Sequence, residues 1–334
     1  MNVLVTGGCG YIGSHTVVEL LNHNYDVVVV DNFSNSKPNV IERIKKITGR
    51  EFKFYELDLC DKSKLVDLFG ENKIDAVIHF AGYKAVGESV AKPLKYYHNN
   101  LFSTINLIEV MNQFNVKKFV FSSSATVYGD PEQLPITETA HLSTTNPYGT
   151  TKLFIENILN DVYNADNNFS IAILRYFNPV GAHPSGLIGE DPNGIPNNLV
   201  PYIVKVANKE LPFLNVFGND YDTIDGTGVR DYIHVVDLAL GHIKALEYIN
   251  HNKGIDYYNL GTGHGYSVLE IVSTFSKVNN VAIPYKIVKR RDGDIATCYA
   301  DTTKAKEVLN WQADKDLAEM LKSAYNYVLM NRGE

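Results

Sequence analysis

The sequence predicts an α/β protein with a doubly wound parallel sheet and a smaller C-terminal α/β lobe. Over the first half of the chain, short runs of β-branched and other apolar residues alternate with helical patterns, which is typical of strands that helices cover on both faces. After residue 178 prolines become frequent and the strand-like runs are fewer. We therefore expect a first lobe at 1–178 and a second lobe at 179–334, and leave open that the chain crosses back between them.

The elements follow in order. The expected strands of the first lobe are the apolar runs at 3–5, 27–30, 52–57, 76–80, 119–122 and 171–175. Helical patterns lie near 12–23, 37–48, 61–70, 92–114 and 148–164. The last of these helices should have Asn146 as its N-cap and Pro147 at its first position, because both residue types are favoured there. In the second lobe we expect helices near 197–209, 236–250, 267–277 and 315–330 and strands near 214–217 and 256–260.

Composition narrows the class of protein. The 334 residues are 45% hydrophobic and 21% charged, which is ordinary for a globular chain, and the net charge of −7 argues against a nucleic-acid partner. No apolar run approaches the ~18 residues that cross a membrane, and the first strand begins at once, so we expect a cytoplasmic protein. Three scattered cysteines without paired Cys/His spacing predict neither disulfides nor a metal site.

A glycine-rich loop joins the first expected strand to the first helix. Gly7, Gly10 and Gly13 in this position let the backbone approach a pyrophosphate at the helix N-terminus, as in a Rossmann-like domain. Asp31 ends the second strand and is placed to accept hydrogen bonds from a ribose, and its charge favours NAD over NADP. Asp58, after the third strand, is either a turn carboxylate or an adenine contact.

Tyr148 and Lys152 are one turn apart on an expected helix, so their side chains share a face. A cation ~6 Å from a phenol favours the phenolate by ~2.8 kcal/mol at an effective dielectric of ~20, about two pKa units. A bound pyridinium would act in the same direction. Three serines, Ser122 to Ser124, follow the fifth strand, where a hydroxyl could reach the same crevice. Each feature is commonplace alone, and their combination predicts an acid/base site with Tyr148, Lys152 and Ser124 as catalytic residues.

The glycine loop, the serines and Tyr-x-x-x-Lys in this order resemble the extended, nucleotide-sugar branch of the short-chain dehydrogenase/reductase superfamily. Further segments resemble its UDP-glucose 4-epimerase family over nearly the whole chain. They are 79–84 (HFAGYK), 99–101 (NNL), 124–129 (SATVYG), 175–178 (RYFN), 226–232 (GTGVRDY) and 290–294 (RRDGD).

The resemblance implies two sets of binding residues. Those implied for NAD, the glycine loop included, are Gly7, Gly10, Tyr11, Ile12, Gly13, Asp31, Asn32, Phe33, Ser34, Asn35, Ser36, Asp58, Leu59, Phe80, Ala81, Gly82, Lys84, Asn99, Ser122, Tyr148, Lys152 and Phe177. Those implied for a UDP-sugar are Lys84, Ser124, Tyr148, Asn178, Asn198, Leu199, Asn215, Phe217, Arg230, Arg291, Asp294 and Cys298. Planar arginine forks also suit a diphosphate on chemical grounds.

The resemblance further implies reversible inversion at C4 of a UDP-hexose through a transient ketone, with NAD regenerated in each turnover. It implies a homodimer, paired through the helices near 92–114 and 148–164. Family members with a small residue at the position of Cys298 tend to accept N-acetylated sugars, so we expect the same here. A UDP-glucuronate epimerase or decarboxylase and a non-catalytic NAD sensor stay open as alternatives. A 4,6-dehydratase is disfavoured, because Ala125 and Thr126 supply no acidic pair beside Ser124.

Overall fold

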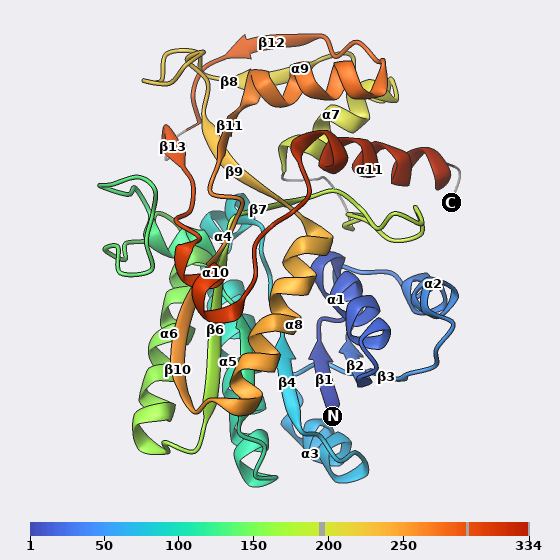
Figure 1. The fold of residues 1–334 in the computed structure, drawn as a ribbon, viewed down its shortest axis with the longest axis vertical. Coiled ribbons are helices and arrows are strands. Elements are labelled where there is room, and N and C mark those ends of the chain that lie inside the picture. Colours follow the sequence, from blue (N-terminus) through green and yellow to red (C-terminus); the bar gives the residue numbers. More distant parts are fainter. Residues whose placement is uncertain (194–197, 292–293, 333–334) are drawn as a thin grey trace.

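A seven-stranded sheet forms the centre of the larger of two lobes (Figure 1). The computed structural model describes residues 1–193, 198–291 and 294–332. The strand order is β10-β6-β5-β4-β1-β2-β3, and every neighbouring pair runs parallel, as predicted. The strands are β1 (Asn2–Thr6), β2 (Asp26–Asp31), β3 (Lys53–Glu56), β4 (Ala76–His79), β5 (Lys118–Ser122), β6 (Ser170–Tyr176) and β10 (Gly254–Leu260).

Helices cover both faces of this sheet, which explains why its strands are apolar almost throughout. Successive residues of β1 belong to different cores: Val3 and Val5 pack on one face, and Leu4 packs on the other. The first face is covered by α1 (Tyr11–Asn22), α2 (Asn39–Thr48) and α8 (Val235–His251), and the second by α3 (Lys62–Glu71), α5 (Pro93–Gln113) and α6 (Pro147–Ala165). The short α4 (Val86–Ala91) and the 3-10 helix η1 (Ala125–Tyr128) were not predicted.

The smaller lobe has two small sheets and three helices around a core of its own. One sheet joins β7 (Asn178–Val180), β9 (Val229–His234), β11 (Gly265–Ser267) and β13 (Thr297–Cys298), and the other joins β8 (Leu214–Phe217) and β12 (Tyr285–Val288). The helices are α7 (Leu199–Ala207), α9 (Val268–Asn279) and α11 (Leu317–Met330). Ile203, Phe275 and Met320, one from each helix, are fully buried in this core.

The chain returns from the smaller lobe to the larger one. We placed the helix near 236–250 and the strand near 256–260 in the second lobe while allowing the chain to cross back, and the structure puts both in the first. There α8 packs on α1, and β10 pairs with β6 at the edge of the sheet, with α10 (Thr303–Leu309) beside it. Buried side chains of α8, such as Leu238 and Leu246, complete the core over α1.

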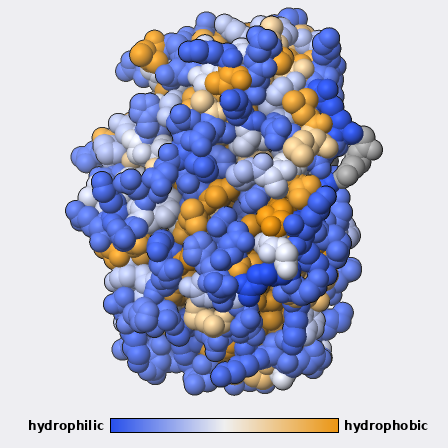
Figure 2. Space-filling view, turned by 45° about the vertical axis from the view of Figure 1, so that its right-hand side comes forward, coloured by the Kyte–Doolittle hydropathy of each residue, from blue (hydrophilic) through white to orange (hydrophobic). Residues whose placement is uncertain are grey.

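Parts of two predicted segments lie outside the described residues: Pro196 and the first residue of the helix near 197–209, and Asp292 and Gly293 of the 290–294 segment. The face of the molecule in Figure 2 is mostly hydrophilic, and hydrophobic residues occur on it in separate groups. No helix within the described ranges is both long and apolar enough to cross a membrane.

Candidate active site

The glycine loop lies between β1 and the N-terminus of α1, as predicted, and two of its glycines are required by close backbone contacts. Gly7 has φ +66°, and a Cβ there would lie 2.8 Å from the backbone nitrogen of Ala81. A Cβ on Gly13 would lie 2.2 Å from the carbonyl oxygen of Gly7. The loop therefore folds tightly against the helix start. The amides of Gly7, Gly8 and Gly10 bond to backbone carbonyls, so the amides left for an anionic group are those of the first turn of α1.

Asp31, at the end of β2, anchors this loop. Its carboxylate is buried and accepts hydrogen bonds from the backbone nitrogens of Cys9 (3.0 Å) and Phe33 (2.9 Å) and from the Ser36 hydroxyl (2.8 Å). Two carboxylate oxygens offer about four acceptor sites, so one remains for a ligand hydroxyl. Asp58 accepts from the Cys60 backbone nitrogen (2.9 Å), as a turn carboxylate does, and from the Asn32 side-chain amide (3.1 Å).

A cavity of about 690 Å³ opens beside the loop and Asp31. It brings together the residues implied for NAD except Phe33, whose ring packs against Phe54 instead, 5.2 Å between centroids. The cavity lining includes Gly7, Gly10, Tyr11, Ile12, Gly13, Asp31, Asn32, Ser34, Asn35, Ser36, Asp58, Leu59, Phe80, Ala81, Gly82, Lys84, Asn99, Ser122, Ser124, Tyr148, Lys152 and Phe177. The donor set, the close backbone at Gly13 and the acceptor at Asp31 fit a dinucleotide.

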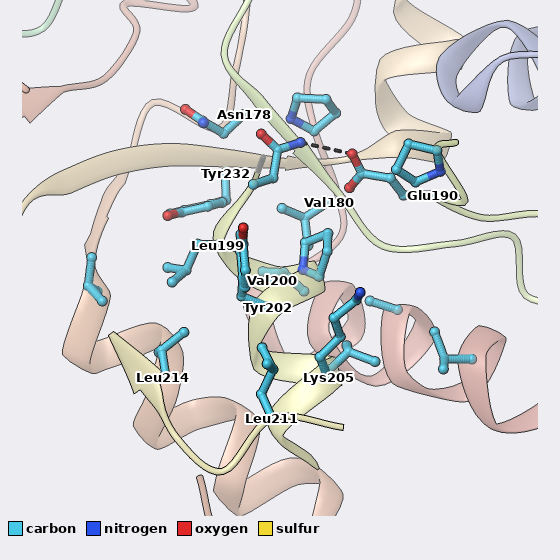
Figure 3. A pocket seen from close by; sticks show the side chains of 18 of the residues that line it. Asn178, Val180, Glu190, Leu199, Val200, Tyr202, Lys205, Leu211, Leu214 and Tyr232 are labelled. Atoms are coloured by element: carbon cyan, nitrogen blue, oxygen red, sulfur yellow. Dashed lines mark hydrogen bonds between the residues drawn. The ribbon is translucent and has the colours of Figure 1, made fainter. Parts of the chain in front are cut away.

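A second cavity, about 1190 Å³, lies in the smaller lobe. It is lined by most of the residues implied for the UDP group, namely Asn178, Asn198, Leu199, Asn215, Phe217, Arg230, Arg291 and Asp294. Figure 3 shows Asn178, Leu199 and Tyr232 around the same hollow, with Glu190 at one side. Asn178, Glu190 and Asn198 line both cavities, so the two spaces adjoin.

Cys298 lines neither cavity. It is buried on β13 and packs in a small cluster with Phe177, which does line the first cavity. Tyr299, the next residue, points elsewhere, because its ring lies near Gly265 on β11. Cys298 therefore sits one layer behind the cavity wall.

Tyr148, Lys152 and Ser124 meet at the carboxyl ends of β5 and β6. The Asn146 side chain caps α6 by accepting from the Gly149 nitrogen (2.9 Å), and Pro147 occupies the first helical position, as predicted. This start places Tyr148 in the cavity beside Ser124, and both side chains line its wall. The Lys152 ammonium lies 6.0 Å from the centre of the Tyr148 ring and donates to the Ser122 carbonyl (2.6 Å).

We expected Lys152 to lower the pKa of Tyr148, but in the protein alone the pKa of Tyr148 is raised. Burial raises the pKa of Tyr148, and the hydrogen bond with Ser124 only partly opposes the rise. Burial also lowers the pKa of Lys152 to about 8, although Glu156 opposes that shift. Desolvation of the phenol is the largest influence on its pKa, and it outweighs a single nearby cation.

Sequence reasoning missed two residues of the site. The Tyr176 hydroxyl, from β6, shares a hydrogen bond with the Ser122 hydroxyl and lines the first cavity. Glu190 accepts from the Asn198 amide (2.9 Å) and lies 3.6 Å from the Lys84 ammonium. Tyr176 stands in the quoted 175–178 segment and could have been found there, whereas nothing in the sequence around Glu190 signals its position.

The site combines a dinucleotide cavity at the carboxyl edge of a parallel sheet, a Tyr/Lys/Ser set in that cavity and an adjoining arginine-lined cavity. These features define a nucleotide-sugar enzyme of the extended short-chain dehydrogenase/reductase class. Residues 4–324 match the family model described as GDP-mannose 4,6 dehydratase. A UDP-glucose 4-epimerase of Bacillus subtilis (strain 168) is 62% identical over 331 residues, covering 99% of this chain and 98% of the relative. The chain belongs to the UDP-glucose 4-epimerase family.

Solved structures agree. The UDP-glucose 4-epimerase of Bifidobacterium longum, in complex with NAD+ and UDP, superposes with a TM-score of 0.96 at 57% identity and 99% coverage of both chains. A UDP-Glc/GlcNAc 4-epimerase from Campylobacter jejuni superposes with a TM-score of 0.87 at 39% identity, covering 98% of this chain and 99% of that one. The 4,6-dehydratase description of the family model does not extend to the site, because Ala125 and Thr126 follow Ser124 on η1 and supply no acid/base pair.

Proposed function

We propose that this NAD-dependent epimerase inverts C4 of UDP-hexoses reversibly, with Tyr148 as its acid/base. The observation that carries the proposal is that Tyr148, Lys152 and Ser124 line one dinucleotide cavity, which adjoins the arginine-lined cavity. The large lobe would hold NAD and the smaller lobe the UDP group. The sugar would then lie where the two cavities meet.

The residues divide the chemistry among them. Tyr148 takes the proton of the C4 hydroxyl, and Ser124 holds the same oxygen and relays the proton. Lys152, protonated, stabilises the phenolate and would help to hold the cofactor, because it lines the same cavity. NAD, when bound, supplies a hydride acceptor that later returns the hydride to C4. Because burial raises the pKa of Tyr148, the phenolate forms only with help from the positive charges around it.

Inversion requires the ketone to present its opposite face to the same cofactor. The site must therefore hold UDP firmly and the hexose loosely. The second cavity supports this division, because Arg230 and Arg291 are among the side chains that line it. Arg230 is held by the carbonyl oxygens of Val229 (2.8 Å) and Ile295 (2.9 Å), so its fork is positioned before a diphosphate arrives.

We further propose activity on the N-acetylated pair, UDP-N-acetylglucosamine and UDP-N-acetylgalactosamine. The Cys298 side chain is small and belongs to the same buried cluster as Phe177, which lines the first cavity. We expect a tyrosine at this position to displace that cluster toward the cavity. The Campylobacter jejuni relative, described as a UDP-Glc/GlcNAc 4-epimerase, gives the same activity precedent in the family.

A cytoplasmic homodimer is the proposed working form. Large apolar side chains are exposed on α5 and α6, the helices expected to pair: Leu94 is 80% exposed, Phe102 52% and Phe154 44%. A two-fold axis through these helices would bury all three. The three cysteines are unpaired, which suits a reducing compartment.

The direct test is to incubate the purified protein with each of the four UDP-sugars and separate the products. We expect interconversion within both pairs without added cofactor, and stoichiometric NAD in the supernatant after denaturation. Failure to convert any of them would refute the proposed function, and NADP in place of NAD would refute the role of Asp31.

A further inference from the structure

Two hydrogen bonds, one helical turn apart along α6, join this helix to the serine turn (residues 122–124) at the end of β5. Tyr148, Lys152 and Glu156 are four residues apart and share one face of α6. Lys152 donates to the carbonyl oxygen of Ser122 (2.6 Å), and one turn further the Glu156 carboxylate accepts from the Ser123 hydroxyl (2.5 Å). Ser124, next in the turn, is the residue whose hydroxyl meets Tyr148. These two hydrogen bonds therefore fix the position of the serine turn relative to α6, the helix that carries Tyr148.

Arg175 on β6 holds Glu156 in place. Its guanidinium makes a two-pronged contact with the carboxylate, Nε to Oε1 at 3.0 Å and Nη2 to Oε2 at 2.6 Å. It also donates to the Tyr128 hydroxyl (3.1 Å) and to the carbonyl oxygen of Glu138 (3.0 Å). Glu156 and Arg175 are 1% and 2% exposed, so this ion pair is sealed from water.

A contribution to folding stability does not readily explain the buried ion pair of Glu156 and Arg175. Removing two charges from water costs several kcal/mol per ion, and well-packed apolar replacements of buried pairs are often neutral or stabilising. A buried ion pair does specify geometry, because both partners lose their hydrogen bonds if either moves. In this protein the ion pair specifies how the serine turn lies against α6. That contact is close to the groups that we propose transfer the proton.

We propose that Ser123, Glu156 and Arg175 form a buried positioning unit that sets the Tyr148–Ser124 geometry and supports the charged form of Lys152. None of the three lines either cavity, so they act through the residues they hold. The proposal rests on the proposed function, because the geometry matters only if Tyr148 and Ser124 transfer the proton.

The second role follows from charge. Lys152 is buried, and Glu156 is the carboxylate that opposes the loss of its proton. The ionisable groups that face this region from the packed elements are Tyr148 and Glu156 on α6, His79 on β4, Tyr96 on α5, Tyr128 on η1, and Arg175 and Tyr176 on β6. Glu156 alone among them carries a carboxyl group. Without its charge, Lys152 should lose its proton at a lower pH.

The experiment compares Glu156→Gln and Ser123→Ala with wild type and with Ser89→Ala. Ser89 is a matched control: it is buried on α4, its hydroxyl donates to the Val86 carbonyl (2.6 Å), and it lies outside both cavities. We expect both test variants to lower kcat by roughly 10-fold while the KM for UDP-glucose and the Kd for UDP change less than ~2-fold. In Glu156→Gln the alkaline limb of the kcat–pH profile should also move about one unit toward lower pH.

Each outcome decides the proposal. Wild-type kcat in folded Ser123→Ala, or equal losses in Ser89→Ala, would overturn it, since a merely structural hydroxyl affects melting temperature and not turnover. A Glu156→Gln variant with lowered kcat but an unmoved alkaline limb would overturn the electrostatic part. If Glu156→Gln does not fold, Ser123→Ala decides the positioning role. An inactive wild type would instead refute the proposed function.

Discussion

Gly13→Ala offers a sharp test of the cofactor loop. A Cβ at this position would lie 2.2 Å from the Gly7 carbonyl oxygen and 2.9 Å from the Gly8 Cα. Both contacts are with backbone, which cannot rotate away as a flexible side chain would. The loop must therefore shift, and the backbone amides that face the cavity would shift with it.

The expected magnitude follows from these contacts. Overpacking of this kind costs about 1–3 kcal/mol in unfolding free energy, and contact with backbone favours the upper end. We expect Gly13→Ala to melt at lower temperature than wild type and to lose most of its bound NAD on purification. The assays are thermal unfolding with and without added NAD, and dinucleotide content after denaturation.

Gly70→Ala provides the control. Gly70 lies near the end of α3, and no atom is within 4 Å of the Cβ that the substitution adds. Alanine is favoured over glycine in a helix by roughly 1 kcal/mol, so this variant should be as stable as wild type or more stable. A Gly13→Ala protein with normal melting temperature and full NAD content would refute the reasoning about the loop.

Three further predictions follow from the site and the core. Tyr148→Phe should lower turnover at least ~10²-fold with UDP binding kept, and near-normal turnover at pH 7 would exclude its acid/base role. Cys298→Tyr should remove activity on the N-acetylated pair and spare the plain hexoses; equal loss of both activities would contradict a size limit. Buried histidines that are neutral in the folded state have pKa values lowered to about 3 or 4, and they are His15, His79, His234 and His242. The unfolded chain binds these protons near pH 6.5, so their stabilisation is complete above that pH and falls by up to ~1.4 kcal/mol per pH unit for each histidine as pH drops toward 4. An unchanged urea midpoint between pH 7 and pH 5 would contradict this sign.

The central sheet could be predicted because its strands bury both faces and so read as continuous apolar runs. The strand β9 was missed for the opposite reason: its VRDYIH sequence has polar residues at buried positions. Asp231 is fully buried there because its carboxylate accepts from the Thr262 and Gly263 nitrogens at 2.8 and 3.0 Å. These hydrogen-bond partners come from a segment that is distant in the sequence, so no local sequence pattern predicts them.

The same contrast applies to the site. Tyr148, Lys152 and Ser124 could be proposed from the sequence because their spacing along a helix and after a strand carries chemical meaning, and the structure brings them to one cavity. The pairing of Glu156 with Arg175 escaped notice, because it depends on how α6 packs against β6. Likewise, the pKa of Tyr148 depends on burial, which spacing between two residues cannot reveal.

The return of the chain through α8 and β10 makes the two lobes inseparable by truncation. A fragment that ends at residue 178 would lack the strand that pairs with β6 over Ser170 to Tyr176, leaving a long open edge of amides and carbonyls. It would also uncover the apolar side of α1 that α8 shields. Such a fragment should aggregate rather than fold as a free cofactor-binding module.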